Sequence, residues 1–216
     1  MRNLKKDEIE MTERREAMLA EGFRLFAERG IEAVVMQEVA EACHHGIATL
    51  YRYYKTKLDL VLAIGTRQWR DYIEYVRQKQ EERNSSAMTA AQELEFYLDF
   101  YLDLYQNHKD LLSFHQSFNH YLAHEKPTPE QLRPYLEALD EMGGFLHVIY
   151  EKGRRDGTIR TDMPEEKLFA TTGHIMMAVG VRYAQSLIFF AGEGEKDRME
   201  EYQLLKKMIL REYLTA

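Results

Sequence analysis

Residues 47–57 concentrate the side chains of this sequence that are best suited to binding chemistry. They place hydroxyls, rings and cations within about three helical turns, as Thr49, Tyr51, Arg52, Tyr53, Tyr54 and Lys57. Small residues lie beside them, at Ala40, Ala42 and Ala48, and allow short helices to pack closely. Hydroxyls and cations on a compact helix pair fit phosphate oxygens, and one helix fits the major groove of duplex DNA. We therefore interpret this segment as a helix-turn-helix.

Catalytic and metal chemistry find little support. The sequence contains no glycine-rich phosphate loop, no GxSxG and no zinc-ligand spacing, so we predict no enzyme activity, cofactor or metal site. For His44 and His45, we expect a turn or a DNA contact rather than a pair of metal ligands. For His120 and His124, we expect a place on the helix surface or in a pocket lining rather than a shared metal. We interpret Cys43 as a small residue that fills buried space, rather than as a redox switch.

The composition is that of a soluble globular protein. Its 216 residues are 45% hydrophobic and 30% charged, with a formal net charge of -7. Residues 1–60 are nearly neutral, so a DNA contact must come from a few placed cations. No run of 18 apolar residues occurs, and the start, MRNLKKDEIEM, lacks the apolar core of a secretory signal. A single cysteine excludes an internal disulfide. We expect a cytoplasmic protein without a membrane segment.

The elements that would position these residues are helices. With only 4 prolines and 12 glycines, long segments repeat their apolar residues at a spacing near 3.6, which predicts an all-α fold. We expect Thr12 to cap the first helix, Gly30 to end it and Thr56 to cap the fourth. The predicted helices cover about 12–29, 36–43, 47–54, 57–80, 89–106, 109–124, 129–155, 164–191 and 195–213.

The stretch AEGFRLFAERGIEAVVMQEVAEACHHGIATLYRYYKTKLDLVLAI, residues 20–64, resembles the TetR family of transcriptional regulators. LFAERG closes that family's first helix, QEVAEA resembles its second, and GIATLYRYYKTK resembles its recognition helix and the start of its fourth. The chain departs from the pattern at His44, where a glycine is usual, and at Val34 and Val35, where a Ser/Thr cap is usual. The resemblance implies a DNA-binding head, residues 1–56, joined by a long helix to a ligand-binding and dimerisation body, residues 57–216.

The resemblance also implies roles for single residues. Thr49, Tyr51 and Lys57 correspond to phosphate contacts, and Tyr53 corresponds to an aromatic that reaches the DNA backbone or a base edge. Ile47 and Ala48 correspond to groove-facing positions, where apolar groups meet thymine methyls. The full predicted DNA-binding set is Gln37, His45, Gly46, Ile47, Ala48, Thr49, Tyr51, Arg52, Tyr53 and Lys57.

We expect a homodimer and a small-molecule effector as further partners. Apolar stripes in residues 175–188 and 204–213 are wide enough to need a partner. The helices of the body carry more aromatic rings and thioethers than an aliphatic core needs, which predicts an effector pocket. Packing of these side chains in the core is the alternative interpretation. The pocket candidates are Phe96, Phe100, Tyr101, Phe114, Phe118, Tyr121, Met142, Phe145, His174, Met177 and Tyr183.

The resulting hypothesis is a ligand-responsive regulator, with repression expected, that binds double-stranded DNA at an inverted-repeat operator. The alternative is an α-helical enzyme or a protein-binding module without DNA activity. Duplex binding with a steep salt dependence would distinguish the two.

Overall fold

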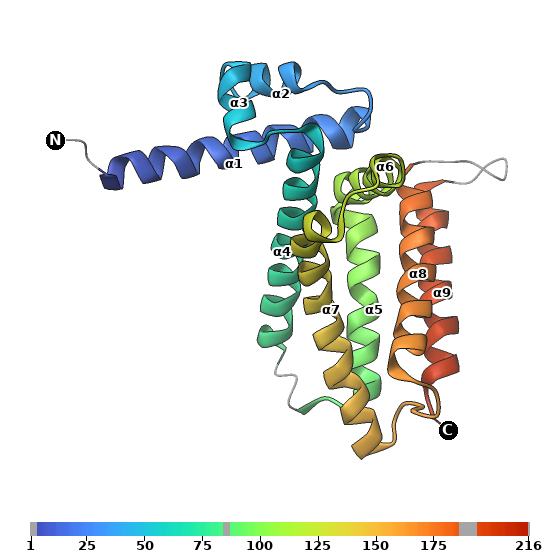
Figure 1. The fold of residues 1–216 in the computed structure, drawn as a ribbon. Coiled ribbons are helices and arrows are strands. Elements are labelled where there is room, and N and C mark those ends of the chain that lie inside the picture. Colours follow the sequence, from blue (N-terminus) through green and yellow to red (C-terminus); the bar gives the residue numbers. More distant parts are fainter. Residues whose placement is uncertain (1–3, 84–86, 186–193, 216) are drawn as a thin grey trace. The chain divides into compact units, whose positions relative to one another are not determined.

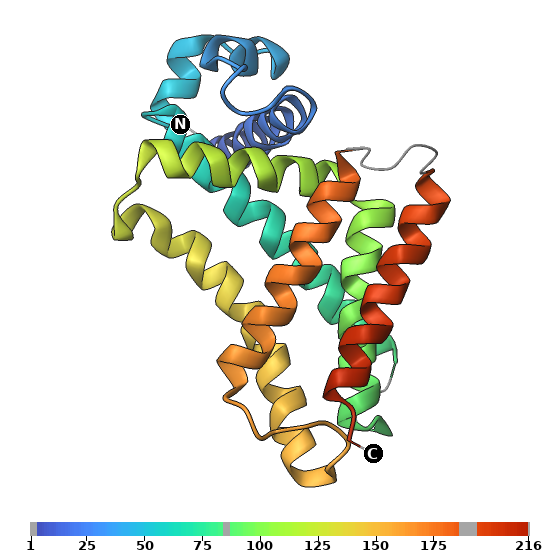
Figure 2. The same cartoon turned by 90° about the vertical axis from the view of Figure 1, so that its right-hand side faces the viewer.

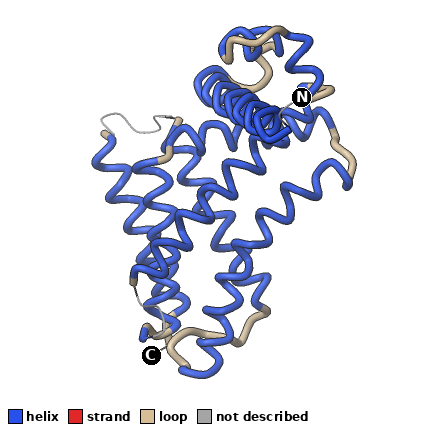
Figure 3. Tube along the Cα trace, turned by 90° about the vertical axis from the view of Figure 1, so that its left-hand side faces the viewer, coloured by secondary structure: helices blue, strands red, loops and turns tan. Residues whose placement is uncertain are grey.

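The computed structural model describes residues 4–83, 87–185 and 194–215 and shows an all-α fold, as predicted (Figure 1). No strand occurs in these ranges (Figure 3). One isolated antiparallel bridge joins Ile159 to Leu214. The helices described there are α1 (Leu4–Arg29), α2 (Met36–Ala42), α3 (Ile47–Tyr53), α4 (Lys57–Glu82), α5 (Ala90–Asn107), α6 (Lys109–Glu125), α7 (Pro129–Asp156), α8 (Glu165–Ala184) and α9 (Glu195–Tyr213).

Most predicted helix ends agree with the structure, but the predicted cap at Thr12 is wrong. Helix α1 already begins at Leu4, and the Thr12 hydroxyl donates to the Glu8 carbonyl at 3.0 Å. No glycine or proline precedes Thr12 to stop the helix, and a threonine inside a helix bonds back to the carbonyl four residues earlier. Gly30 ends α1 as expected, at a φ of 81°, which glycine adopts without strain.

Two further expectations concern α4 and α8. The Thr56 hydroxyl accepts from the Asp59 amide at 3.1 Å, and the Asp59 carboxylate accepts from the Thr56 amide at 3.0 Å. This reciprocal pair is a capping box, so the predicted start of α4 is confirmed. Helix α8 was expected to reach residue 191 but is described only to Ala184; positions 186–193 lie outside the described residues.

The chain divides into two compact units. The first unit comprises residues 1–69 and 113–137, and the second comprises residues 70–112 and 138–216. The helices α4, α6 and α7 each contribute residues to both units. The predicted domain boundary after residue 56 separates a DNA-binding head from a ligand-binding body, and it stays a prediction. The two compact units are divided at other positions, after residues 69, 112 and 137.

In the first unit, glycines let helices approach closely. A Cβ at Gly22 would lie 2.7 Å from Ile64 Cδ1, so α1 and α4 are in direct contact. A Cβ at Gly65 would lie 2.7 Å from the Phe118 ring, so α4 also touches α6. The Phe114 ring contacts Phe23 of α1 at a centroid distance of 5.5 Å. Residues 113–125 of α6 are therefore part of the core that supports the helix pair.

In the second unit, α5 packs against both α8 and α9, which also contact each other (Figure 2). The Tyr202 hydroxyl of α9 donates to the Met176 carbonyl of α8 at 2.6 Å. Lys206 of α9 is buried between two carboxylates of α5, with Nζ 2.5 Å from Asp99 and 3.3 Å from Glu95. These polar contacts fix the register of the three helices. No described helix has the length and apolarity needed to cross a membrane.

Candidate nucleic-acid interface

The turn between α2 and α3 is compact. Cys43 caps α2, and His44 adopts the left-handed conformation with a φ of 56°. That conformation lets the His45 amide donate to the Ala40 carbonyl at 2.8 Å, which closes the end of α2. Gly46 then starts α3 in extended backbone, at a φ of -70°. The departure at His44 is thus a histidine in the conformation that favours glycine.

Helix α3 has one buried side and one exposed side. Leu50 is fully buried, and Tyr54, directly after the helix, is buried as well. Ala48, Tyr51 and Arg52 are exposed, and their spacing places them on one face of the helix. Lys55, which follows the end of the helix, is also exposed. The buried leucine therefore orients an outward face that carries a methyl group, a phenol and a guanidinium.

The other predicted DNA-binding residues lie around this face. His45, Ile47, Thr49 and Tyr53 are half-buried, whereas Gln37 and Gly46 are exposed. The Gln37 amide donates to the Glu41 carboxylate at 2.7 Å. The Arg52 guanidinium lies 5.8 Å from the Tyr53 ring centroid.

Lys55 was missed by the sequence reasoning. The resemblance assigned the phosphate contact to Lys57, and nothing drew attention to the lysine two positions earlier. Lys55 follows the end of α3 by two residues, and its position directly after the recognition segment was the available signal. Residues 36–57 carry three lysines and arginines against two glutamates, so this local segment is slightly basic within an acidic chain.

Lys57 is placed differently from Lys55. It is half-buried, and its Nζ lies 5.5 Å from the Tyr121 ring centroid and 3.5 Å from the Glu32 carbonyl oxygen, to which it donates. Burial lowers the pKa of Lys57, and the nearby carboxylate of Glu32 opposes this shift. In this conformation, the ammonium is already engaged within the first unit.

The start of α2 is capped by a residue that the sequence reasoning did not consider. Val35 has no side-chain acceptor, but its amide donates to the Glu38 carboxylate at 2.8 Å. Arg29 holds the same carboxylate at 2.7 Å. The Val35 amide, and then Arg29, lower the pKa of Glu38. The missing Ser/Thr cap is thus replaced by half of a capping box.

The cysteine and histidine alternatives can also be placed. Cys43 is buried, its thiol lies 3.0 Å from the Val39 carbonyl, and burial raises its pKa, as expected for an inert filler. The rings of His120 and His124 are 4.9 Å apart on exposed helix surface. In the described ranges, no group of three or more possible ligands surrounds a metal position.

The predicted effector residues are distributed over both units. In the first unit, Phe114, Phe118 and Tyr121 are buried, and the Phe118 ring lies tilted against the Tyr135 ring at a centroid distance of 4.7 Å. The candidates in the second unit differ in burial. Three are buried, namely Phe96, Phe100 and Tyr101, and four are half-buried, namely Met142, Phe145, Met177 and Tyr183. His174 is exposed. The Tyr101 hydroxyl lies 3.3 Å from the Tyr97 hydroxyl.

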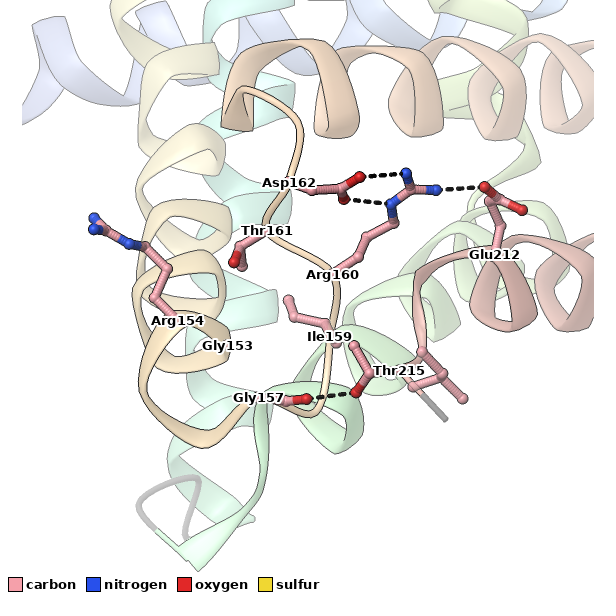
Figure 4. A pocket seen from close by; sticks show the side chains of 10 residues that line it. Gly153, Arg154, Gly157, Ile159, Arg160, Thr161, Asp162, Glu212 and Thr215 are labelled. Carbon is pink, nitrogen blue, oxygen red and sulfur yellow. Dashed lines mark hydrogen bonds and ion pairs between the residues drawn. The ribbon is translucent and has the colours of Figure 1, made fainter.

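An open pocket of about 660 Å³ lies in the second unit, where the α7–α8 connection meets the C-terminal segment (Figure 4). Arg160 holds Asp162 with two hydrogen bonds, at 2.7 and 2.8 Å, and Glu212 at 2.5 Å. The Thr215 hydroxyl donates to the Gly157 carbonyl. The arginine is matched by two carboxylates, so these contacts join two chain segments and leave no excess positive charge.

Comparison with known proteins agrees with this geometry. Residues 18–64 match the family model described as bacterial regulatory proteins, tetR family. A search of curated proteins found no match.

Solved structures are similar along almost the whole chain. A transcriptional regulator from Saccharomonospora viridis in complex with choline has a TM-score of 0.71 at 16% identity, covering 95% of this chain and 100% of the other. The regulator FadR from Bacillus subtilis in complex with stearoyl-CoA has a TM-score of 0.69 at 15% identity, covering 91% and 98%. The ketosteroid regulator KstR2 of Mycobacterium tuberculosis has a TM-score of 0.61 at 16% identity, covering 94% and 96%. At these identities the likeness shows the fold.

The match over residues 18–64 assigns this segment, which contains the helix-turn-helix, to the family of bacterial regulatory proteins described as tetR. This match defines a class of protein: DNA-binding transcriptional regulators with a helix-turn-helix. The family consists of regulators, so the enzymatic alternative is set aside.

Proposed function

We propose that the chain binds an inverted-repeat duplex as a homodimer, represses transcription there, and changes its DNA affinity when a small molecule binds. The exposed face of α3 carries the proposal, because Leu50 fixes that face outward and it presents Tyr51 and Arg52. Phenols and guanidinium groups contact phosphates and base edges. Lys55 extends this surface toward the DNA backbone.

The homodimer is supported by exposed aliphatic side chains on two neighbouring helices. Ile175 of α8 is 42% exposed, and Leu204 and Met208 of α9 are 56% and 63% exposed. Leu204 and Met208 are one turn apart, so they share a face of α9. A second copy of this surface would cover them in a two-fold arrangement. Such a dimer places two recognition helices roughly 34–36 Å apart, which predicts an inverted repeat.

The effector is supported by the supply of buried rings in the second unit, among them Phe96, Phe100 and Tyr101. Two of the similar structures contain choline and stearoyl-CoA. Helix α4 contributes residues to both units, and a ligand that prefers one of its positions would shift DNA affinity by its differential affinity, typically about 1–3 kcal/mol.

The test begins with duplexes selected from genomic DNA by the purified full chain. Fluorescence anisotropy then measures their affinity at several salt concentrations. We expect Arg52→Ala to weaken binding and to reduce the salt slope by about one if it contacts a phosphate. Arg154→Ala, an exposed arginine of the second unit, is the matched control and should leave both unchanged. Equal binding by the Arg52→Ala variant and the wild type would remove α3 as the recognition helix.

Repression is tested separately by transcription in vitro from a promoter that contains the selected duplex. Added protein should reduce the transcript. An increase in transcript would reverse the proposed sign of regulation without affecting the assignment of the DNA-binding face.

A further inference from the structure

Arg198 of α9 is a buried cation that has no counter-charge among the described residues. It is 7% exposed, and within the described ranges its hydrogen bond is a long one, from Nη1 to the Tyr183 carbonyl at 3.5 Å. Its Nε has no acceptor, and no carboxylate among the described residues lies within ion-pair distance. An arginine keeps its proton at any ordinary pH, and a buried charge without a partner is strongly unfavourable. An anion is therefore the partner that this side chain lacks.

Tyr105 of α5 supplies a second unpartnered donor in the same region. Its side chain is 1% exposed, and its hydroxyl has no hydrogen-bond partner. The Tyr105 ring lies 5.9 Å from the Tyr183 ring and 6.1 Å from the Tyr202 ring. Tyr183 thus contacts both residues, Tyr105 through its ring and Arg198 through its carbonyl oxygen. Arg198 and Tyr202 are also one turn apart on the same face of α9.

Another buried cation on α9 shows how the fold treats a structural charge. Lys206 is as buried as Arg198, but Asp99 and Glu95 of α5 lie within 2.5 and 3.3 Å of its ammonium. The part of the chain that the structure describes provides two carboxylates for Lys206 and none for Arg198. A residue that served packing alone would be replaced favourably by an apolar side chain of similar volume, because an unmatched buried charge destabilises the fold.

We propose that Arg198 and Tyr105 bind the carboxylate of a small organic acid, with its apolar part against the rings of Tyr183 and Tyr202. A guanidinium matches a carboxylate in plane and charge, and a phenol adds one donor. A phosphate dianion would carry nearly two negative charges against the single positive charge of Arg198. The three tyrosine rings offer a large contact area for an apolar or aromatic group. This assignment rests on the proposed effector-binding function and names its ligand class.

The test uses thermal unfolding and calorimetry of the full chain with benzoate, phenylacetate and hexanoate, each at millimolar concentration. At least one acid should raise the unfolding temperature, because a ligand that binds only the folded state stabilises it. Benzamide, the uncharged counterpart of benzoate, should have no effect. Phenyl phosphate is the competing anion, and stronger stabilisation by it than by every carboxylate would overturn the assignment to organic acids.

Three variants separate binding from structure. Arg198→Met should weaken binding of the stabilising acid at least tenfold, and Tyr105→Phe should weaken it severalfold. Without ligand, both should unfold at or above the wild-type temperature, because each removes an unpartnered buried polar group. Arg211→Met, an exposed arginine of the same helix, should bind the acid like wild type.

Two results would overturn the proposal. One is wild-type acid binding by Arg198→Met together with a lower unfolding temperature, which would make Arg198 structural. The other is the absence of stabilisation of the wild type by all three acids. Neither affects the duplex titration with Arg52→Ala, which is carried out without acid, so the proposed DNA-binding function can stand or fail independently.

Discussion

The ammonium of Lys57 lies over the ring of Tyr121, 5.5 Å from its centroid, and connects the start of α4 to α6 within the first unit. The family resemblance assigns this lysine to a DNA phosphate, whereas the structure places it against a ring and the Glu32 carbonyl. Lys57 must give up these contacts to reach a phosphate, so they oppose its binding to DNA.

Replacing Tyr121 by leucine should therefore strengthen DNA binding. A cation–π contact at a partly exposed site is worth about 0.5–1 kcal/mol, which corresponds to a roughly two- to fivefold change in affinity. Anisotropy titrations of the selected duplex would measure it. Tyr121→Phe keeps the ring and is the matched control, with affinity expected to stay at the wild-type value. Weaker binding by Tyr121→Leu, with the fold intact, would contradict this account.

The stability of the first unit should fall in mild acid because of His115. Its ring contacts Trp69 edge-on, its Nε2 lies 3.1 Å from Asn119, and burial lowers its pKa to about 4. An unfolded histidine titrates near 6.5, so between pH 6.5 and 4 the unfolded state binds more protons than the folded state. Stability is fully present above pH 6.5 and is lost as the pH falls toward 4, by roughly 3 kcal/mol at most.

Denaturant unfolding at several pH values would measure this loss. His115→Leu removes the titrating group, and its stability should depend less on pH across the same window. His124→Gln, on exposed helix surface, should retain the wild-type pH dependence. An unchanged pH profile in His115→Leu would assign the acid sensitivity to other groups.

A methyl group at Gly65 should destabilise the protein. The added Cβ would lie 2.7 Å from the buried Phe118 ring, and overpacking of this kind costs about 1–3 kcal/mol, partly offset by the better helix propensity of alanine. Chemical denaturation of Gly65→Ala would show it. Gly144→Ala in α7 meets nothing within 4 Å and should instead stabilise by up to about 1 kcal/mol. If both variants shifted stability alike, the close approach of α4 and α6 would be in doubt.

The proposed dimer surface predicts a change in assembly. Replacing both Leu204 and Met208 by glutamate places charges on the exposed face of α9, where a second copy would bury them. Sedimentation velocity at micromolar concentration should then show monomers, and a dimer for the wild type. Leu136→Glu, on an α7 position that is 48% exposed, should remain dimeric. A wild-type monomer under these conditions would exclude the homodimer.

The sequence predicted the helices and the family because these depend on local signals. Thr56 and Asp59 form the expected cap, and Gly30 has the expected positive φ. The cap at Thr12 failed because a threonine inside an uninterrupted helix is chemically the same as one at its start. Lys57 was predicted to face DNA because a family resemblance relates residues by their type and position. It gives no information on a contact with the ring of Tyr121, which lies 64 positions later in the sequence.

Arg198 could not be found from the sequence. It lies in the run EKDRMEEY, which has the composition of a solvated helix surface. Its burial, and the lack of an ion-pair partner among the described residues, depend on which side of α9 faces α5 and α8. A residue whose importance lies in a missing partner gives no local pattern, so only tertiary packing reveals it.

The DNA-reading helices belong to a unit that is discontinuous in the sequence. Phe114 packs on α1, Phe118 fills the space at Gly65, and Tyr121 covers Lys57, although all three follow the helix pair by more than fifty residues. A fragment ending at residue 69 would expose these apolar contact surfaces to water. A chimera that exchanges DNA specificity between two regulators joins the helix pair of one to the rest of the other. A single cut after the recognition helix would separate the helix pair from residues 113–137, so that segment would have to be transferred with it.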